Sequence, residues 1–277
     1  EPEAPIILLC APAGYGKTTL AREWVGADAL WYSVRPADSD VAAFAAGLAE
    51  LFADAVSTGE LDPVERVRSL AVRGLPAKSL ARPLADAAVG TEAVLVVDDY
   101  HYAAESAEAE SLFHEFTLRS RLRIVLTSRV RPSWVTARSR VYGDVVLVGP
   151  EQLAFTEEET KSALKLATGS TDSELFSVVG GWPAVIGLAA VQGSTSELTR
   201  TLAPRALYEF FAEELFGSVE PLVQRSMLQL AAAGDSSIEI ARDLIGASLD
   251  DVLQSATARG FLTHEPNGTL VMHPLLR

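Results

Sequence analysis

The chain has 277 residues, and its 23 Lys and Arg against 37 Asp and Glu give a formal net charge of −14. Its length predicts two domains, with room for a small third, and a hydrophobic share of 48% excludes a wholly disordered chain. The acidic balance argues against direct nucleic-acid binding, because phosphate contacts need clustered Lys and Arg. The single cysteine excludes a disulfide framework and indicates a reducing compartment, the cytoplasm.

Neither a leader nor a membrane span is expected. Residues 1–10 lack a basic segment, and no apolar run approaches the roughly 18 residues that a spanning helix needs. The sequence starts without Met and stops at Arg277, directly after an apolar stretch. We therefore expect a fragment of a longer protein, with sensing and DNA-binding modules outside it.

The first half of the sequence alternates short apolar runs with stretches of helical spacing. The apolar runs predict buried strands at 6–10, 30–34, 93–97, 123–127 and 145–148. Helical spacing predicts helices at 17–25, 41–53 and 106–118, and the proline-interrupted stretch 61–89 predicts two or three broken helices. This alternation predicts an α/β fold with a parallel sheet and helices on both faces.

After Gly149-Pro150 the alternation of apolar runs and helical stretches gives way to a mainly helical pattern. Thr156 followed by three glutamates predicts the N-terminus of a helix, with the carboxylates near the positive end of its dipole. Two strands at 261–264 and 269–273 flank a turn and predict a hairpin. Helices followed by a hairpin favour a winged helix, so we divide the chain into a nucleotide-binding domain (1–150), a helical domain (151–205) and a winged-helix domain (206–277).

The sharpest motif lies between the first strand and the first helix, at 11–19 (APAGYGKTT). Gly14 and Gly16 stand where backbone N–H groups must close around phosphate without a Cβ in the way. Lys17 would reach the β- and γ-phosphates, and the Thr18 hydroxyl would bind Mg²⁺. Ala11 stands where the usual pattern has glycine, and the alternative is a glycine-rich turn with a chance lysine. The residues predicted to bind nucleotide here are Ala13, Gly14, Tyr15, Gly16, Lys17, Thr18 and Thr19.

Polar residues follow two further strands. Asp98 and Asp99 directly follow the strand at 93–97, at the place where Mg²⁺ is needed opposite a phosphate loop. We assign Asp98 to the metal and Asp99 to orienting or deprotonating the attacking water; two solvated acids are the alternative. Arg129 follows the strand at 123–127 and could contact the γ-phosphate, although it stands among other arginines that would merely be solvated. Asp99, Lys17 and Arg129 form the predicted catalytic set.

Two later elements remain open from the residues alone. Gly180-Gly181-Trp182-Pro183 reads equally as a helix end and restart or as backbone packed on adenine. His273 fits a core position as well as a ligand contact. His101 and His114 are interpreted as structural, because no further metal ligand stands at a suitable spacing.

Taken in order, these motifs resemble the MalT-type transcription regulators, large ATP-binding members of the LuxR family in the STAND class of P-loop NTPases. The resemblance rests on the phosphate loop and on LVVDDYH (95–101), LTSR (126–129), QLAFT (152–156), GWPA (181–184), RGFL (259–262) and MHPL (272–275). It covers about residues 6–276. The family tolerates a small residue in place of the first glycine of the loop.

The resemblance implies an ATP/ADP switch with slow hydrolysis and a sheet order of 5-1-4-3-2. It implies that the ADP form is a closed monomer and that the ATP form oligomerises, with Mg²⁺ as cofactor. It also implies that Arg129 senses the γ-phosphate, Pro183 packs on adenine and His273 contacts the β-phosphate of ADP. By the same resemblance, we expect the sensor and DNA-binding domains of such a regulator to lie outside this sequence.

Two other functions are alternatives to the switch. A P-loop phosphotransferase acting on a small substrate would need a substrate pocket and an arginine-rich lid, which the long helical half does not favour. A DNA-binding winged helix would need a basic recognition helix, whereas 249–260 contains Asp250, Asp251 and a single basic residue, Arg259.

Overall fold

The computed structural model of the chain describes residues 5–26, 28–55, 63–72, 76–168, 181–184, 186–187, 217, 219–234, 236–258, 261–264 and 269–272. The chain divides into two compact units. The first consists of Glu1–Cys10 and Lys17–Val148, and the second of Ala11–Gly16 and Gly149–Arg277. In the part of the chain that is described, no helix has the length and apolar character needed to cross a membrane.

A five-stranded parallel sheet forms the centre of the first unit. Its strands are β1 (Ile6–Cys10), β2 (Leu30–Ser33), β3 (Leu95–Asp98), β4 (Ile124–Ser128) and β5 (Val145–Val148). They lie in the order β2-β3-β4-β1-β5, and every pairing is parallel. The predicted strands, the parallel sheet and the strand order implied by the family resemblance are confirmed. Strands β3 and β4 each end one residue later than predicted, so Asp98 and Ser128 are strand residues.

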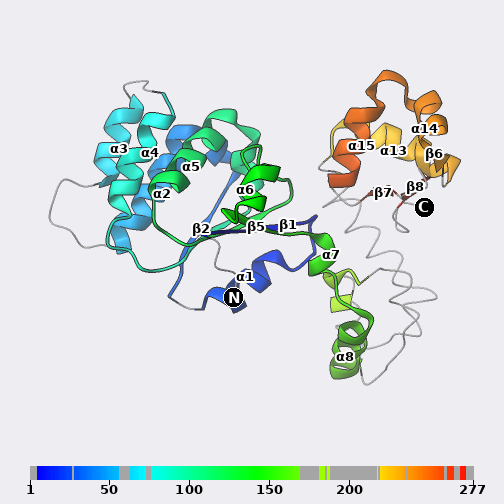
Figure 1. Cartoon of the computed structure of the whole chain (residues 1–277), viewed down its shortest axis with the longest axis horizontal. Helices are drawn as coiled ribbons and strands as arrows, with labels where there is room; N and C mark the ends of the chain where they lie inside the picture. Colours follow the sequence, from blue (N-terminus) through cyan, green and yellow to red (C-terminus); the bar gives the residue numbers. More distant parts are fainter. Residues whose placement is uncertain are drawn as a thin grey trace. The chain divides into compact units, whose positions relative to one another are not determined.

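Helices cover both faces of this sheet, as predicted. Three helices, α2 (Val41–Ala55), α4 (Lys78–Ala87) and α5 (Ala107–Arg119), lie on one side, and α1 (Lys17–Val25) lies on the other (Figure 1). Side chains along β3 alternate between the two cores: Leu95 and Val97 pack under the three helices, and Val96 packs under α1. This alternation follows from the two-residue period of a strand. The stretch predicted as broken helices forms α3 (Pro63–Val72) and α4.

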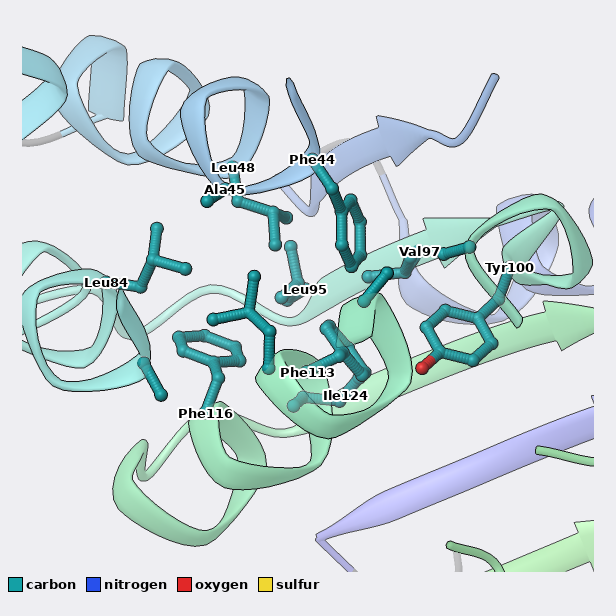
Figure 2. Packing of buried hydrophobic residues seen from close by; sticks show 14 of the residues in the cluster. Phe44, Ala45, Leu48, Leu84, Leu95, Val97, Tyr100, Phe113, Phe116 and Ile124 are labelled. Carbon is teal, nitrogen blue, oxygen red and sulfur yellow. The ribbon is translucent and has the colours of Figure 1, made fainter. Parts of the chain in front are cut away.

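Aromatic side chains fill the larger core (Figure 2). The Phe113 ring of α5 lies 5.8 Å from the Phe44 ring of α2 and 5.0 Å from the ring of Tyr100, measured between centroids. Tyr100 is fully buried and begins the short 3-10 helix η2 (Tyr100–Glu105) that follows β3. The packing of Tyr100 therefore fixes the chain at the carboxyl end of β3, next to the two acids.

Shorter elements, which the sequence did not predict, complete the first unit. The 3-10 helix η1 (Pro36–Ser39) follows β2, and α6 (Ala137–Val141) lies between β4 and β5. Both sit in connections between predicted elements and leave the sheet order unchanged.

The second unit begins with α7 (Pro150–Leu153) and α8 (Glu157–Thr168). The start of α8 is held by a reciprocal capping box: the Glu159 N–H donates to Thr156 Oγ1 (3.2 Å), and the Thr156 N–H donates to Glu159 Oε2 (2.8 Å). These bonds from Thr156 lower the pKa of the Glu159 carboxyl, because they stabilise its charged form. The predicted helix start at Thr156 is confirmed.

The later part of this unit combines three helices with a small antiparallel sheet. The helices are α13 (Pro221–Ala233), α14 (Ile238–Ile245) and α15 (Leu249–Ala258), with η5 (Gly246–Ser248) between the last two. The strands are β6 (Ser236–Ser237), β7 (Leu262–His264) and β8 (Thr269–Met272), in the order β6-β8-β7. Leu262 pairs with Met272, and His264 pairs with Leu270. The antiparallel pairing predicted for the hairpin is confirmed, while its turn at 265–268 lies outside the described residues.

Candidate functional site

The loop at Ala11–Gly16 joins β1 to α1, which begins at Lys17. Gly14 and Gly16 adopt φ angles of 78° and 70°, a left-handed backbone that L side chains disfavour. A Cβ at Gly14 would lie 2.7 Å from Ala184 Cβ and 2.8 Å from Trp182 Nε1, so a side chain there would also collide. Glycine is thus required at Gly14 by both backbone and packing, and at Gly16 by the backbone.

Within the second unit, this loop is bonded to the segment 181–184. The Trp182 indole N–H donates to the Ala13 carbonyl (3.2 Å), and the Ala184 N–H donates to the Gly14 carbonyl (2.9 Å). The Tyr15 ring stacks on the Trp182 ring at 6.2 Å. Trp182 is 2% exposed, so these contacts are shielded from water. The described part of the segment is therefore bonded directly to the loop.

The segment 181–184 is itself fixed by a glycine. Gly181 has a φ of 77°, and a Cβ there would lie 2.0 Å from the Phe155 carbonyl oxygen. The Phe155 N–H donates to the Gly181 carbonyl (2.8 Å). Pro183 is half-buried and lies between the two residues that bond to the loop. Gly180 and His273 lie outside the described residues.

Lys17 is buried at the start of α1, with 7% of its surface exposed. Burial lowers the pKa of its ammonium to about 8, and the nearby charge of Arg129 acts in the same direction. Asp99, Cys10 and Asp98 act against this shift. Burial makes the charged form of Lys17 less stable than it would be in water, and an anionic ligand would stabilise that form.

Asp98 ends β3 and is 5% exposed. Its Oδ1 accepts hydrogen bonds from the Thr18 hydroxyl (2.9 Å) and from the Thr127 hydroxyl (2.6 Å). The Thr18 and Asp98 oxygens are therefore adjacent, and hard oxygen donors of this kind suit Mg²⁺. Among the described residues, no group of three or more His, Cys, Asp or Glu could hold a metal by itself. Phosphate oxygens and water would have to complete the coordination, which is the usual arrangement for Mg²⁺ on a nucleotide.

Asp99 turns the chain at the end of β3. Its backbone is left-handed (φ 56°, ψ 39°), and its N–H donates to Thr127 Oγ1 (2.9 Å). Burial raises the pKa of the Asp99 carboxyl, as does the charge of Asp98, while Arg129 and Lys17 act in the opposite direction. A carboxyl with a raised pKa is better suited to accept a proton than an ordinary surface aspartate.

Arg129 follows β4 and is half-buried, whereas Arg121, Arg123 and Arg131 are exposed. Its charge influences both Lys17 and Asp99. The structure thus separates Arg129 from the surface cluster and brings together the three residues predicted as catalytic. Thr19, also predicted to bind nucleotide, is exposed on α1.

The segment after Arg129 is anchored at two points. The buried Glu110 carboxylate on α5 accepts a hydrogen bond from the Ser133 N–H (2.9 Å) and a second from the Ser133 hydroxyl. The Trp134 indole N–H donates to the Tyr100 hydroxyl (3.2 Å). These bonds limit the freedom of the chain that carries Arg129.

Two residues at this site were not assigned a role from the sequence. The His101 Nδ1 lies 3.7 Å from Asp99 Oδ1, and burial, together with Arg129 and Lys17, lowers the pKa of its imidazole to about 3. The second is Thr127, whose hydroxyl contacts both acids. His101 lies two residues beyond Asp99, and Thr127 is a polar residue that directly follows the apolar residues Ile124–Leu126 of β4. Both positions are signals that could have found these residues.

Comparisons with solved structures define the class of fold. A STAND protein with a tetratricopeptide repeat sensor from Pyrococcus horikoshii matches 98% of this chain and 39% of its own, with a TM-score of 0.50 and 18% identity. The ORC2 protein of Aeropyrum pernix, solved as ADPNP–ADP complexes, matches 99% of this chain and 85% of its own, with a TM-score of 0.54 and 14% identity. The chain has the fold of STAND and AAA+ P-loop NTPases.

Sequence comparison narrows this class. No family model matches the chain. The HTH-type transcriptional regulator MalT of Vibrio campbellii is 29% identical over 251 residues, or 83% of the chain, and MalT of Vibrio cholerae is 27% identical over 269 residues, or 90%. The chain spans 27% and 29% of the length of these two relatives. It is therefore MalT-like over most of its length.

Proposed function

We propose that this chain is the nucleotide-binding switch of a transcriptional regulator, alternating between a closed ADP form and an ATP form that oligomerises. One observation carries the proposal: the loop Ala11–Gly16, followed directly by Lys17, is hydrogen-bonded to the segment 181–184. These hydrogen bonds connect the residues that would bind phosphate to the segment 181–184, which would have to move in the proposed switch.

Nucleotide binding is assigned to the loop and the start of α1. The backbone of Ala13–Gly16 would surround the β-phosphate, and the N-terminus of the nine-residue helix α1 favours an anion. Lys17 would bind the β- and γ-phosphates, with Thr18 and Thr19 completing the cradle. Ligand phosphate would offset the cost of the buried ammonium, which supports Lys17 as the main charge contact.

Mg²⁺ is assigned to Thr18 and Asp98, whose oxygens are adjacent. The ion would neutralise phosphate charge, and these two residues would orient it. Asp99 would position or deprotonate the attacking water, and Arg129 would contact the γ-phosphate. The result would be a slow ATPase whose purpose is to reset the switch.

The second unit supplies the proposed conformational response. Pro183 would pack on adenine, and His273 would contact the β-phosphate of ADP in the closed form. Coupling energies of about 1–3 kcal/mol are typical of such switches, and one charge-assisted hydrogen bond of about 1.5–3 kcal/mol would supply that amount. The backbone link between Gly14 and Ala184 gives the loop a direct connection to this response.

We further propose the division into a nucleotide-binding domain (1–150), a helical domain (151–205) and a winged helix (206–277). The arrangement of α13, α14 and α15 with the sheet β6-β8-β7 supports the last assignment. Helix α15 carries Asp250 and Asp251 and no basic residue, so this fragment would not bind DNA directly. Sensing and DNA binding would belong to other parts of a full-length cytoplasmic protein.

Separate substitutions test the binding and hydrolysis assignments. Lys17→Ala should abolish ADP binding measured by calorimetry, because it removes the phosphate-binding charge. Asp99→Ala should retain binding and lose hydrolysis. If Asp99→Ala hydrolyses ATP at the parent rate, the role assigned to this carboxyl is wrong.

The proposed closure on ADP is tested at His273. His273→Ala should release ADP faster, measured with a fluorescent ADP analogue displaced by excess ADP. An unchanged dissociation rate would remove His273 from the site. Rapid turnover that depends on an added small-molecule acceptor would instead favour the phosphotransferase.

A further inference from the structure

Thr127 occupies an unusual position for a polar side chain. It is the fourth residue of β4, pairs with Leu9 of β1 in the middle of the sheet, and is fully buried. A hydroxyl in such a place must have hydrogen-bond partners to offset its loss of water. The partners of Thr127 are Asp98, the last residue of the neighbouring strand β3, and Asp99, which follows it.

The two hydrogen bonds use the hydroxyl in opposite senses. Thr127 Oγ1 accepts from the Asp99 N–H (2.9 Å) and donates its proton to Asp98 Oδ1 (2.6 Å). Because a hydroxyl has a single proton, the bond to Asp98 fixes which lone pairs face Asp99. One side chain therefore holds the carboxylate of the first acid and the backbone of the second.

The bond to Asp99 stabilises an unfavourable backbone. Within the described ranges, Asp99 is the one non-glycine residue with a positive φ. A left-handed residue points its side chain away from the course that an extended strand would give it. Asp98 consequently accepts a hydrogen bond from the Thr18 hydroxyl. Asp99 instead lies beside His101, and the charges of Lys17 and Arg129 act on its carboxyl.

We propose that Thr127 is a positioning residue that directs Asp98 to the metal and Asp99 to the attacking water. This inference rests on the proposed ATP hydrolysis. Without the hydroxyl, Asp98 keeps its bond to Thr18, but the Asp99 N–H loses its partner at the point where the chain turns. The metal and phosphate contacts should survive, and the orientation of Asp99 should not.

The test compares Thr127→Val with Thr127→Ser. Valine keeps the branched shape that suits a strand and removes the hydroxyl, while serine keeps the hydroxyl. Thr127→Val should lower kcat for ATP hydrolysis by about 10-fold or more, with ADP affinity changed less than about 3-fold. Thr127→Ser should restore kcat to within about 3-fold of the parent, whereas a merely structural role predicts no rescue specific to the hydroxyl.

Thr160 provides a matched control. It is also fully buried, and its Oγ1 has no hydrogen-bond partner among the described residues. Thr160→Val should therefore leave kcat unchanged. If it lowers kcat as much as Thr127→Val does, the effect is a general consequence of the exchange and the inference fails.

Asp99→Ala, measured in parallel, separates failure of the inference from failure of the proposed function. If Asp99→Ala loses hydrolysis and Thr127→Val does not, the positioning role of Thr127 is wrong and the switch stands. If Asp99→Ala hydrolyses normally, the proposed role of Asp99 fails first.

Thr127→Cys decides the case in which Thr127→Val does not fold. Its thiol is a weak donor and acceptor, so the cysteine variant should bind ADP normally and show a reduced kcat. A parent kcat in that variant, or equal losses of kcat and ADP affinity, would overturn the inference.

Discussion

Lys17→Met should stabilise the nucleotide-free protein while abolishing nucleotide binding. The substitution keeps an unbranched side chain of similar length and removes the buried ammonium. In the folded chain the pKa of Lys17 falls from 10.5 to about 8, chiefly through burial and secondly through Arg129. At 1.36 kcal/mol per pKa unit, keeping the charge in this place costs about 3 kcal/mol. Functional residues commonly carry such a cost in stability.

The pH dependence of this effect has a definite sign. Because the folded pKa lies below the unfolded one, the folded state binds fewer protons between about pH 8 and 10.5. The penalty in the parent is therefore complete below about pH 8 and disappears as the pH rises toward 10.5. The variant has no such group, so its advantage should shrink over this window.

Urea unfolding of both proteins, freed of nucleotide, measures the difference at about pH 7 and about pH 10. We expect Lys17→Met to be more stable by about 3 kcal/mol at the lower pH and by clearly less at the higher pH. A variant less stable than the parent at neutral pH, or an equal gap at both values, would refute the reasoning.

Three further substitutions probe the loop and its supports. Gly14→Ala should lower both stability and ADP affinity, since the left-handed backbone alone costs about 1–2 kcal/mol and the new Cβ would collide with Trp182 and Ala184. Gly26→Ala is the control: Gly26 has the same backbone strain but open space around it, so its substitution should lower stability alone. Trp182→Phe removes the indole donor to the loop and should cost about 1 kcal/mol in thermal unfolding; ADP affinity should fall with it, and unchanged affinity would separate this bond from the site. Glu110→Gln leaves one acceptor for the two donors of Ser133 and should lower the unfolding free energy by about 1–2 kcal/mol; a neutral result in urea unfolding would show that this anchor contributes nothing.

The sheet was predictable because its signals are local. Strands such as Ile6–Cys10 are short apolar runs, which the sequence shows directly. Their alternation with helices implies parallel pairing. The loop at 11–19 and the two acids at the end of β3 could be located for the same reason. The carboxyl ends of parallel strands meet at one edge of the sheet, which agrees with the predicted set of Lys17, Asp99 and Arg129.

Other parts of the site depend on partners that are distant in the sequence. The bond from Trp182 to Ala13 joins residues 169 positions apart, and no spacing rule reports it. The position of Thr127 in its strand draws attention to a polar residue but does not name its partners, since threonine is common in sheets. Its importance appears once β3 and β4 are adjacent and its hydroxyl reaches both acids.

His101 illustrates the same limit. The absence of a further metal ligand near it in the sequence says nothing of its environment, because that environment is set by charges on other elements. Arg129 after β4 and Lys17 on α1 both act on its imidazole, and burial keeps it neutral at physiological pH. A local pattern could report the motif LVVDDYH but not the electrostatic surroundings of its last residue.

The most direct test of the switch is the identity of the nucleotide that the protein carries. Freshly purified protein would be denatured, and the released nucleotide identified and quantified by ion-pair chromatography. The account predicts ADP at close to one molecule per chain, because the resting form is closed over its nucleotide. An empty site combined with rapid ATP turnover would contradict it and identify an ordinary enzyme.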